Sequence, residues 1–158
     1  MPLVRWLALA GVVVVLDQLG KAAAEAWLQP HTAHAVLPGL NLTLVYNTGA
    51  AFSMLSQAGG WQRWLLAVLA AAVSAFIVVW LARLPRDERW TALALSLIMG
   101  GAIGNLVDRL LRGYVVDFVD IYYGSYHWPA FNVADSAITV GAVILIVYSL
   151  FFTRSGSG

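Results

Sequence analysis

The chain has 158 residues, of which 61% are hydrophobic and only 11% are charged. A soluble domain needs many more polar side chains to cover its surface, so this composition indicates that the solvent is a lipid bilayer. The formal net charge of +1 gives no reason to expect nucleic acid as a partner, because phosphate binding needs a concentrated basic surface. The chain contains no cysteine, so it has no disulfide, thiolate metal site or thiol nucleophile.

The first predicted element is a transmembrane helix over about residues 5–24. An apolar run from Leu7 to Leu16 continues past Asp17 and Lys21, and the whole stretch is long enough to cross about 30 Å of hydrocarbon. The alternative is a cleavable signal peptide. Such peptides are seldom charged between the apolar run and the cleavage point, so we expect a retained helix.

Three further apolar stretches predict transmembrane helices over about residues 62–83, 90–111 and 134–152. In the segment 25–60, which connects the first two spans, Leu40, Leu42 and Leu44 alternate with polar residues, as in a strand with one apolar face. We therefore expect residues 1–154 to form a single four-helix membrane domain, with 155–158 as a flexible tail.

The arginines predict how the chain crosses the membrane. They lie before the first span, between the second and third spans, and after the fourth, at Arg5, Arg83, Arg86, Arg89 and Arg154. By the positive-inside rule these places are cytoplasmic. Both termini are then cytoplasmic, and residues 25–60 and 112–133 lie outside.

Polar side chains in and beside the predicted spans converge on the outer side. A charge near the middle of a span costs about 2.5 to 3.5 kcal/mol on insertion scales, so each needs a partner or a purpose. Taken alone, Asp17 and Lys21 could form a mutually neutralising ion pair, and the end of the third helix could be an interfacial cap. Convergence at one depth instead favours a shared polar site made of Asp17, Lys21, Asn105, Asp108, Arg109, Asp117, Asn132 and Asp135.

Carboxylates are the groups that this predicted site has in surplus. Two carboxylates brought close share a proton, so that one can take a proton from water while the other donates to a peptide carbonyl. The residue pattern alone leaves open whether Asp108, Asp117 or Asp120 would take part.

Other chemistries have weaker support in the sequence. His31 and His34 are more consistent with solvated loop residues than with metal ligands. A serine peptidase could use Ser53 or Ser136 with Lys21 as the base, but no motif supports that pairing. We therefore expect neither a metal nor a cofactor.

Five segments of the chain resemble the lipoprotein signal peptidases, or signal peptidase II. In chain order they are Asp17-Gln18-x-x-Lys21, Asn47-Thr48-Gly49-Ala50-Ala51-Phe52, Gly104-Asn105-Leu106-Val107-Asp108-Arg109, Val115-Val116-Asp117-Phe118 and Phe131-Asn132-Val133-Ala134-Asp135-Ser136. One departure is Gly20, where the family usually has a hydroxyl residue.

The resemblance implies a bacterial intramembrane aspartic peptidase that removes the signal peptide of a prolipoprotein, cutting before a Cys that already bears diacylglyceryl. Asp117 and Asp135 match the catalytic pair, which leaves Asp120 as an interfacial carboxylate that water can solvate. Roles in supporting the pair or binding substrate are implied for Asp17, Lys21, Asn47, Gly49, Asn105, Asp108, Arg109, Asn132 and Ala134.

The fold implied is an all-α membrane protein with four transmembrane helices and a small extracytoplasmic β-containing cradle, formed from residues 25–60. It is expected in the bacterial inner membrane as a monomer, with its active site toward the outer leaflet. The expected partners are lipid-modified prolipoprotein signal peptides and membrane lipids.

Two other classes remain open. A small proton- or ion-coupled transporter also places acids and amides inside helices, but it is usually built from internal repeats, and this chain shows no matching halves. A purely structural membrane subunit would make the polar residues individually replaceable.

Overall fold

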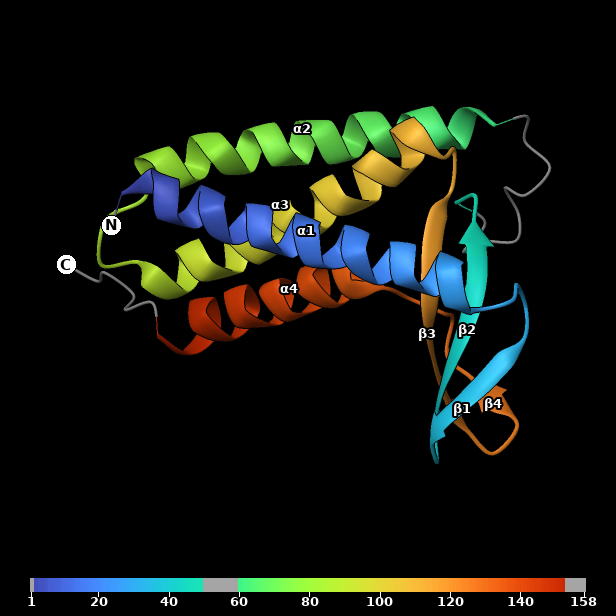
Figure 1. Cartoon of the computed structure of the whole chain (residues 1–158). Coiled ribbons are helices and arrows are strands. Elements are labelled where there is room, and N and C mark those ends of the chain that lie inside the picture. Colours follow the sequence, from blue (N-terminus) through green and yellow to red (C-terminus); the bar gives the residue numbers. More distant parts are fainter. Residues whose placement is uncertain (1, 50–59, 153–158) are drawn as a thin grey trace.

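A computed structural model describes residues 2–49 and 60–152. Its elements are α1 (Leu3–Trp27), β1 (Ala33–Leu37), β2 (Leu40–Asn47), α2 (Trp61–Arg83), α3 (Arg89–Leu111), β3 (Val115–Tyr123), β4 (Tyr126–His127) and α4 (Val133–Phe151). The helices form a bundle, and the sheet stands across one end of it (Figure 1). The expected combination of a helical membrane bundle with a small β-containing cradle is confirmed.

All four helices are long and apolar enough to cross a membrane, and each of their bounds lies within three residues of the predicted one. The third is the central helix. In α3, 56% of the most apolar 18-residue stretch is buried inside the protein, compared with 17% in α1, 22% in α2 and 17% in α4. The other three helices therefore pack around α3 and leave their remaining faces to lipid.

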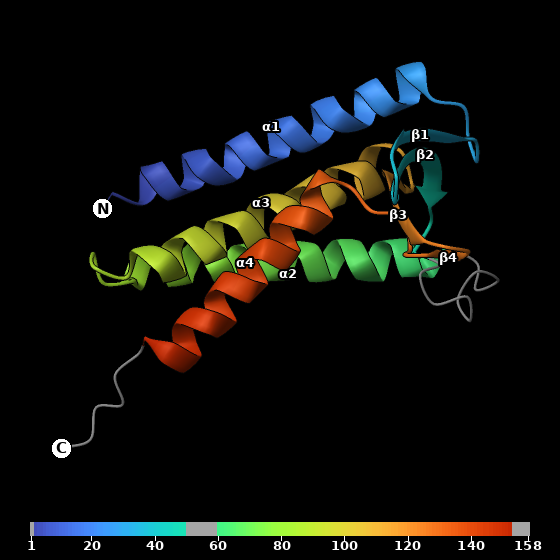
Figure 2. The same ribbon diagram turned by 90° about the horizontal axis from the view of Figure 1, so that it is seen from below.

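Glycines allow this close packing. A Cβ added at Gly100 would lie 2.8 Å from the carbonyl oxygen of Ala10 on α1, and one at Gly101 would overlap the carbonyl oxygen of Ala134 on α4. Lipid gives no hydrophobic drive for helices to associate, so close backbone contact supplies much of the attraction. Figure 2 shows α4 crossing α3 at an angle, with its C-terminal end diverging from the bundle.

The sheet has the order β1-β2-β3-β4, and each neighbouring pair is antiparallel. Strand β2 contains the predicted alternating segment, and Leu44 packs with Val116 and Ala24 to attach the sheet to α1. The sequence prediction placed the cradle within residues 25–60 only. That boundary is wrong, because the connection after α3 supplies β3 and β4.

The chain returns from β4 to β3 before it enters α4. Phe131 and Val119 exchange both backbone hydrogen bonds, at 3.0 and 2.8 Å. This pairing places the first residues of α4 beside the middle of β3.

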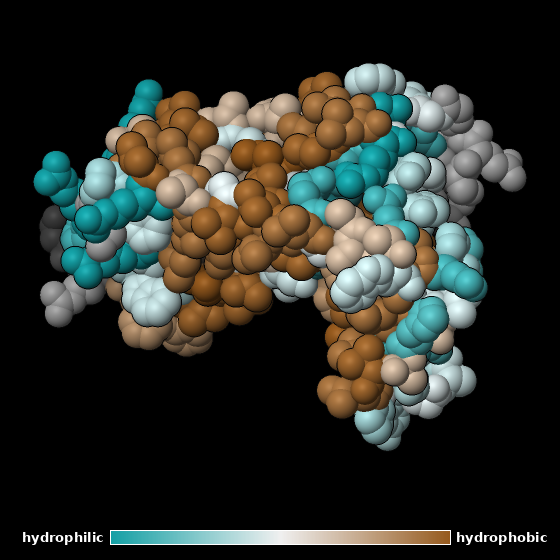
Figure 3. All heavy atoms as spheres, in the orientation of Figure 1, coloured by the Kyte–Doolittle hydropathy of each residue, from teal (hydrophilic) through white to brown (hydrophobic). Residues whose placement is uncertain are grey.

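One end of the bundle lies opposite the sheet. The start of α1, the α2–α3 connection and the end of α4 lie together, opposite the sheet (Figure 1). In Figure 3 hydrophobic residues cover the middle of the helices, and hydrophilic residues gather at the end where α1 starts. Arg154 and the predicted tail lie outside the described residues.

We predict that Gly101→Ala destabilises the protein, because its Cβ would overlap the backbone of Ala134 and force α3 and α4 apart. Overpacking of this kind costs about 1 to 3 kcal/mol. The matched control is Gly11→Ala, a helical site where the new Cβ would meet no atom of another element within 4 Å. Thermal unfolding in detergent should give a lower Tm for the first variant and an unchanged or higher Tm for the second; equal values would contradict the packing described.

Candidate active site between the bundle and the sheet

A groove of about 870 Å³ lies where the sheet meets the helices. Its wall is mostly apolar, and its charged side chains are Asp117, Asp135 and Arg109. It is lined by Asn47, Arg109, Asp117, Ile121, Trp128, Pro129, Ala130, Phe131, Asp135, Ser136, Thr139 and Val140. An apolar cleft with a few convergent polar groups is the usual form of a substrate site.

Strand β3 carries Asp117 into the groove, where the residue is only 2% exposed. Its Oδ2 accepts a hydrogen bond from Asn47 Nδ2 at 3.0 Å, and its Oδ1 accepts one from Asn132 Nδ2 at 2.7 Å. Burial raises the pKa of Asp117 to about 6; the hydrogen bond from Asn47 opposes the rise, and the charge of Asp135 adds to it. Asp117 therefore takes up a proton more readily than an ordinary aspartate.

Asp135 lies in the first turn of α4, where the helix dipole favours a carboxylate. Its Oδ1 accepts a hydrogen bond from Asn105 Nδ2 at 2.7 Å. Its backbone N–H donates to Oδ1 of Asn132, which is the N-cap of the helix, at 2.9 Å. Asn132 thus caps α4 with its oxygen and holds Asp117 with its nitrogen, so one side chain connects the carboxylate of Asp117 with the backbone of Asp135.

The partners of Asn105 set which way its amide points. Its Oδ1 accepts from Lys21 Nζ at 2.9 Å and from Asn132 Nδ2 at 3.3 Å. Lys21 can only donate, so the oxygen of Asn105 must face it and the amide nitrogen is left to donate to Asp135.

Behind Asn105 lies a buried ion cluster of Asp17, Lys21 and Asp108, whose side chains are 0% exposed. Lys21 Nζ lies 2.7 Å from Asp17 Oδ2 and 2.7 Å from Asp108 Oδ2. With Asn105, these contacts use all three ammonium donors. Lys21 is therefore part of a larger cluster than the predicted pair with Asp17, and it is not a base for Ser136, whose hydroxyl donates to the Asn132 carbonyl at 2.9 Å. Ser53 lies outside the described residues.

The two acids of this cluster also hold the backbone beside each groove carboxylate. Asp17 Oδ1 accepts from the N–H of Ala134, next to Asp135, at 2.9 Å. Asp108 Oδ2 accepts from the N–H of Val116, next to Asp117, at 3.2 Å. The cluster therefore fixes the positions of α4 and β3 relative to each other.

Comparison with known proteins identifies the family. The sequence profile of signal peptidase (SPase) II matches residues 9–151. The chain belongs to the signal peptidase II family. It is therefore a membrane-embedded protease, and the transporter and structural-subunit alternatives are wrong.

Relatives and solved structures extend this result over nearly the whole chain. The lipoprotein signal peptidase of Teredinibacter turnerae is 51% identical over 150 residues, covering 95% of this chain and 89% of the relative. That of Pseudomonas fluorescens is 54% identical over 142 residues, covering 89% and 84%. A solved bacterial membrane enzyme matches with a TM-score of 0.80 at 30% identity, covering 95% of this chain and 94% of that one.

The remaining predicted residues surround the same groove. The N–H of Gly49, which has a φ of 95° that favours glycine, donates to Asn47 Oδ1 at 2.9 Å and leaves the amide nitrogen of Asn47 for Asp117. Arg109 lines the groove and donates to the Asn105 carbonyl at 3.2 Å. The motif residues Ala50, Ala51 and Phe52 lie outside the described part of the chain.

Gly20, the departure from the family pattern, lies against the strand of Asp117. A Cβ there would lie 3.2 Å from the ring of Phe118. Glycine therefore lets α1 approach β3 closely. His31 and His34 are exposed, and the described residues contain no group of three or more His, Cys, Asp or Glu side chains placed to hold a metal ion.

Sequence reasoning gave no role to Arg112 or Gln18. Arg112 Nη1 lies 2.6 Å from Asp108 Oδ1 and 3.0 Å from Gln18 Oε1. Asp17 and Asp108 are thus balanced by two cations, Lys21 and Arg112. The spacing of Arg112 four residues after Asp108 on one helix face was the available signal.

The prediction that water solvates Asp120 is wrong. The residue is 7% exposed, and it accepts hydrogen bonds from Asn41 Nδ2 and Thr43 Oγ1 at 3.2 Å each. Its Oδ1 also lies 2.8 Å from His127 Nδ1. Burial alone would raise the pKa of Asp120, but the hydrogen bonds from His127, Asn41 and Thr43 outweigh burial and lower it. Asp120 joins β2, β3 and β4.

We predict that Asn47→Ala shifts the pH dependence of peptidase activity, because it removes a hydrogen bond that lowers the pKa of Asp117. A higher pKa keeps the proton on the carboxylate pair to higher pH. The alkaline limb of the kcat profile, expected at or above about pH 6, should therefore move upward.

Asn41→Ala is the matched control, because Asn41 makes the same kind of bond to Asp120. Asn41→Ala should leave the alkaline limb of the kcat profile where it is in the parent protein. A downward shift with Asn47→Ala, or equal shifts in both variants, would contradict this assignment.

Proposed function

We propose that this signal peptidase II is an aspartic endopeptidase that removes the signal peptide of diacylglyceryl-modified prolipoproteins, cutting before the lipid-modified Cys. The observation that carries the proposal is the pair Asp117 and Asp135, which line one groove and are linked through Asn132, a partner of the Asp117 carboxylate and of the Asp135 backbone. The name of the relatives, lipoprotein signal peptidase, supplies the substrate class.

In the proposed reaction the pair enters with one proton. The ionised carboxylate removes a proton from a water molecule, and the water oxygen bonds to the scissile carbonyl carbon. The protonated carboxyl gives its proton to the carbonyl oxygen, so that a neutral tetrahedral diol forms. One hydroxyl then returns a proton to the pair while the other carboxyl protonates the leaving nitrogen, the C–N bond breaks, and the pair again holds one proton.

The amides beside the pair suit this cycle. Asn47, Asn105 and Asn132 donate hydrogen bonds without bringing positive charge into direct contact with either carboxylate. A cation in contact would hold both groups ionised, and the pair would then lack the proton that it must donate. We assign Arg109, the groove's guanidinium, to binding the polar part of the substrate.

We predict that Asp117→Asn and Asp135→Asn each reduce turnover by at least about 100-fold, because an amide can neither accept nor deliver the proton. Asp87→Asn, at an exposed loop residue, is the control and should keep full activity. Asp120→Asn tests the sheet instead: it should lower the Tm more than Asp87→Asn does, while retaining measurable cleavage. A correctly inserted Asp117→Asn protein that cleaves like the parent would end the proposal.

We predict that cleavage requires the diacylglyceryl group. The groove lies at one end of the spans, so acyl chains buried in the bilayer would set the depth of the scissile bond. In parallel assays with one precursor, the lipid-modified form should be cleaved and the unmodified form should survive. Equal rates would favour a general signal peptidase.

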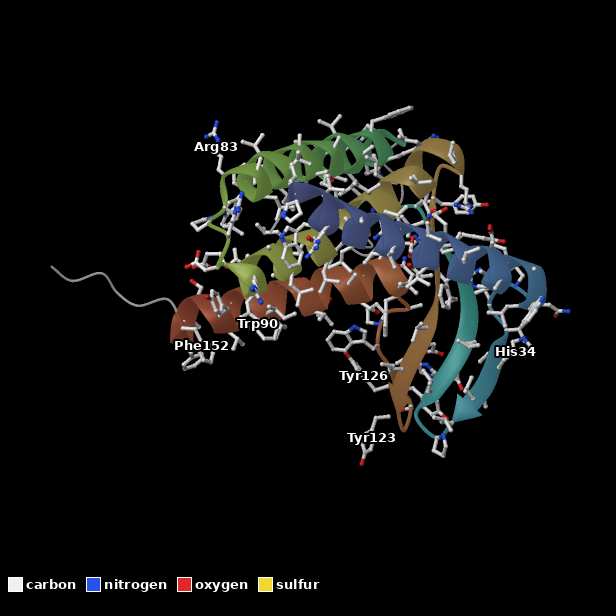
Figure 4. All side chains as sticks on the ribbon, turned by 60° about the vertical axis from the view of Figure 1, so that its left-hand side comes forward. His34, Arg83, Trp90, Tyr123, Tyr126 and Phe152 are labelled. Atoms are coloured by element: carbon white, nitrogen blue, oxygen red, sulfur yellow. The ribbon has the colours of Figure 1, made fainter. Side chains whose placement is uncertain are left out.

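We also propose that residues 1–154 act as one monomeric domain in the bacterial inner membrane, with both termini cytoplasmic, the groove toward the outer leaflet and membrane lipids around it. The start of α1 and the Arg83–Arg89 connection lie at the end opposite the sheet (Figures 1 and 4). Reporter fusions after Arg86 should therefore give cytoplasmic signals, and fusions after Gly124 external ones. The reverse pattern would refute this orientation.

A further inference from the structure

One face of α4 presents a regular stripe that runs from the groove toward the other end of the helix. Ser136, Val140, Val143 and Val147 follow one another at spacings of four, three and four residues. This is the spacing at which one helix packs along another, with small and β-branched side chains at the contact. Val140, Val143 and Val147 are 51%, 54% and 43% exposed. We call these four residues the α4 seam.

The α4 seam connects two hollows. Ser136 and Val140 line the groove that holds Asp117 and Asp135. Val143 and Val147 line a second, apolar hollow of about 430 Å³, whose far wall includes Trp90 of α3 and Phe152. A lipid-facing helix ordinarily presents a convex surface, whereas here neighbouring side chains make both ends of the stripe concave.

Both hollows lie on the same side of the molecule. Figure 4 shows Trp90 and Phe152 at one end of α4, and Tyr126 and Tyr123 beside its other end, all on one side of the helix. Figure 2 shows the C-terminal end of α4 diverging from the other helices. Because the four seam residues lie on one face of α4, the two hollows follow one another along that face, and the first of them holds the two carboxylates. We call this succession of hollows the track.

The length of the track matches the apolar part of a signal peptide. Eleven residues separate Ser136 from Val147, or about 16 Å along a helix. An apolar signal-peptide core of about 7 to 15 residues spans about 10 to 22 Å when helical. A signal helix that begins at the far end of the bundle and delivers its C-terminal end to Asp117 and Asp135 runs antiparallel to α4.

We propose that the α4 seam is the docking surface for the apolar helix of the substrate's signal peptide, an inference that rests on the peptidase function proposed above. The signal helix packs its own small and β-branched side chains along Val140, Val143 and Val147. Its position on the seam places the following extended residues in the groove. α4 therefore both contributes Asp135 and guides the segment that is removed.

Disulfide crosslinking tests the docking surface directly, because the chain contains no cysteine. Val143→Cys and Val147→Cys are made in the Asp117→Asn background, so that bound precursor stays intact. The lipid-modified precursor carries one added cysteine in its apolar core, while the thiol of its acylated cysteine is blocked by the lipid. The controls are Val68→Cys on α2 and Val15→Cys on α1, which replace the same residue type at 67% and 56% exposure.

Crosslinking should be at least severalfold greater at the two seam positions than at the controls. Moving the precursor cysteine one turn toward its N-terminus should shift the preferred partner from Val143→Cys to Val147→Cys, as an antiparallel register requires. Equal crosslinking on α1, α2 and α4, or a preference for a control position, would overturn the proposal and make the seam a lipid-facing surface.

A kinetic test separates this inference from the proposed function. Val143→Trp in the active protein should raise KM severalfold with little change in kcat, while Val68→Trp should change neither. If the parent cleaves lipid-modified precursor and Val143→Trp has the same KM, the docking surface is wrong and the peptidase function stands. If the parent does not cleave the precursor at all, the proposed function itself fails.

Discussion

The structure depends on one buried ammonium group, that of Lys21, placed between the carboxylates of Asp17 and Asp108. Charges without water are tolerated only when every donor and acceptor has a partner, and removing one partner of such a cluster costs about 3 to 5 kcal/mol. Here the carboxylate oxygens are shared among Lys21, neighbouring amides and the backbone. The same carboxylates that neutralise Lys21 also hold the backbone of α4 and β3. One buried cluster therefore both positions the groove and balances the charges behind it.

One layer of amides separates the charges of the Lys21 cluster from Asp117 and Asp135. Lys21 reaches Asp135 only through Asn105, and Asp117 is held by Asn47 and Asn132. Neutral donors orient a carboxylate while allowing burial to keep the pKa of Asp117 near 6. Direct ion pairing would have given equal rigidity but would have removed the proton on which aspartic chemistry depends. This explains why a site inside a membrane protein uses three asparagines rather than further lysines or arginines.

Much of the bundle could be predicted from sequence, because each span is a long apolar run and the few polar residues within these runs had to meet. Strand β3 could not, because its nine residues include Asp117 and Asp120 and do not stand out from a connection. Had the strand been recognised, its two-residue period would have shown that residues three apart point to opposite faces. That difference in facing separates Asp117, which lines the groove, from Asp120, which bonds to β2 and β4. The choice of Asp117 came instead from family resemblance, and Arg112 was missed because a residue at a helix end needs no buried partner to explain it.

The double use of Asn132 has a consequence for biosynthesis. Its side chain begins α4 and at the same time holds the carboxylate on β3. In the proposed mechanism, a chain whose α4 has not yet packed against the sheet lacks both the oriented acid and the oriented base. On the proposed mechanism, peptidase activity therefore arises only once α4 has packed against the sheet, and copies in which α4 is not yet packed are inactive.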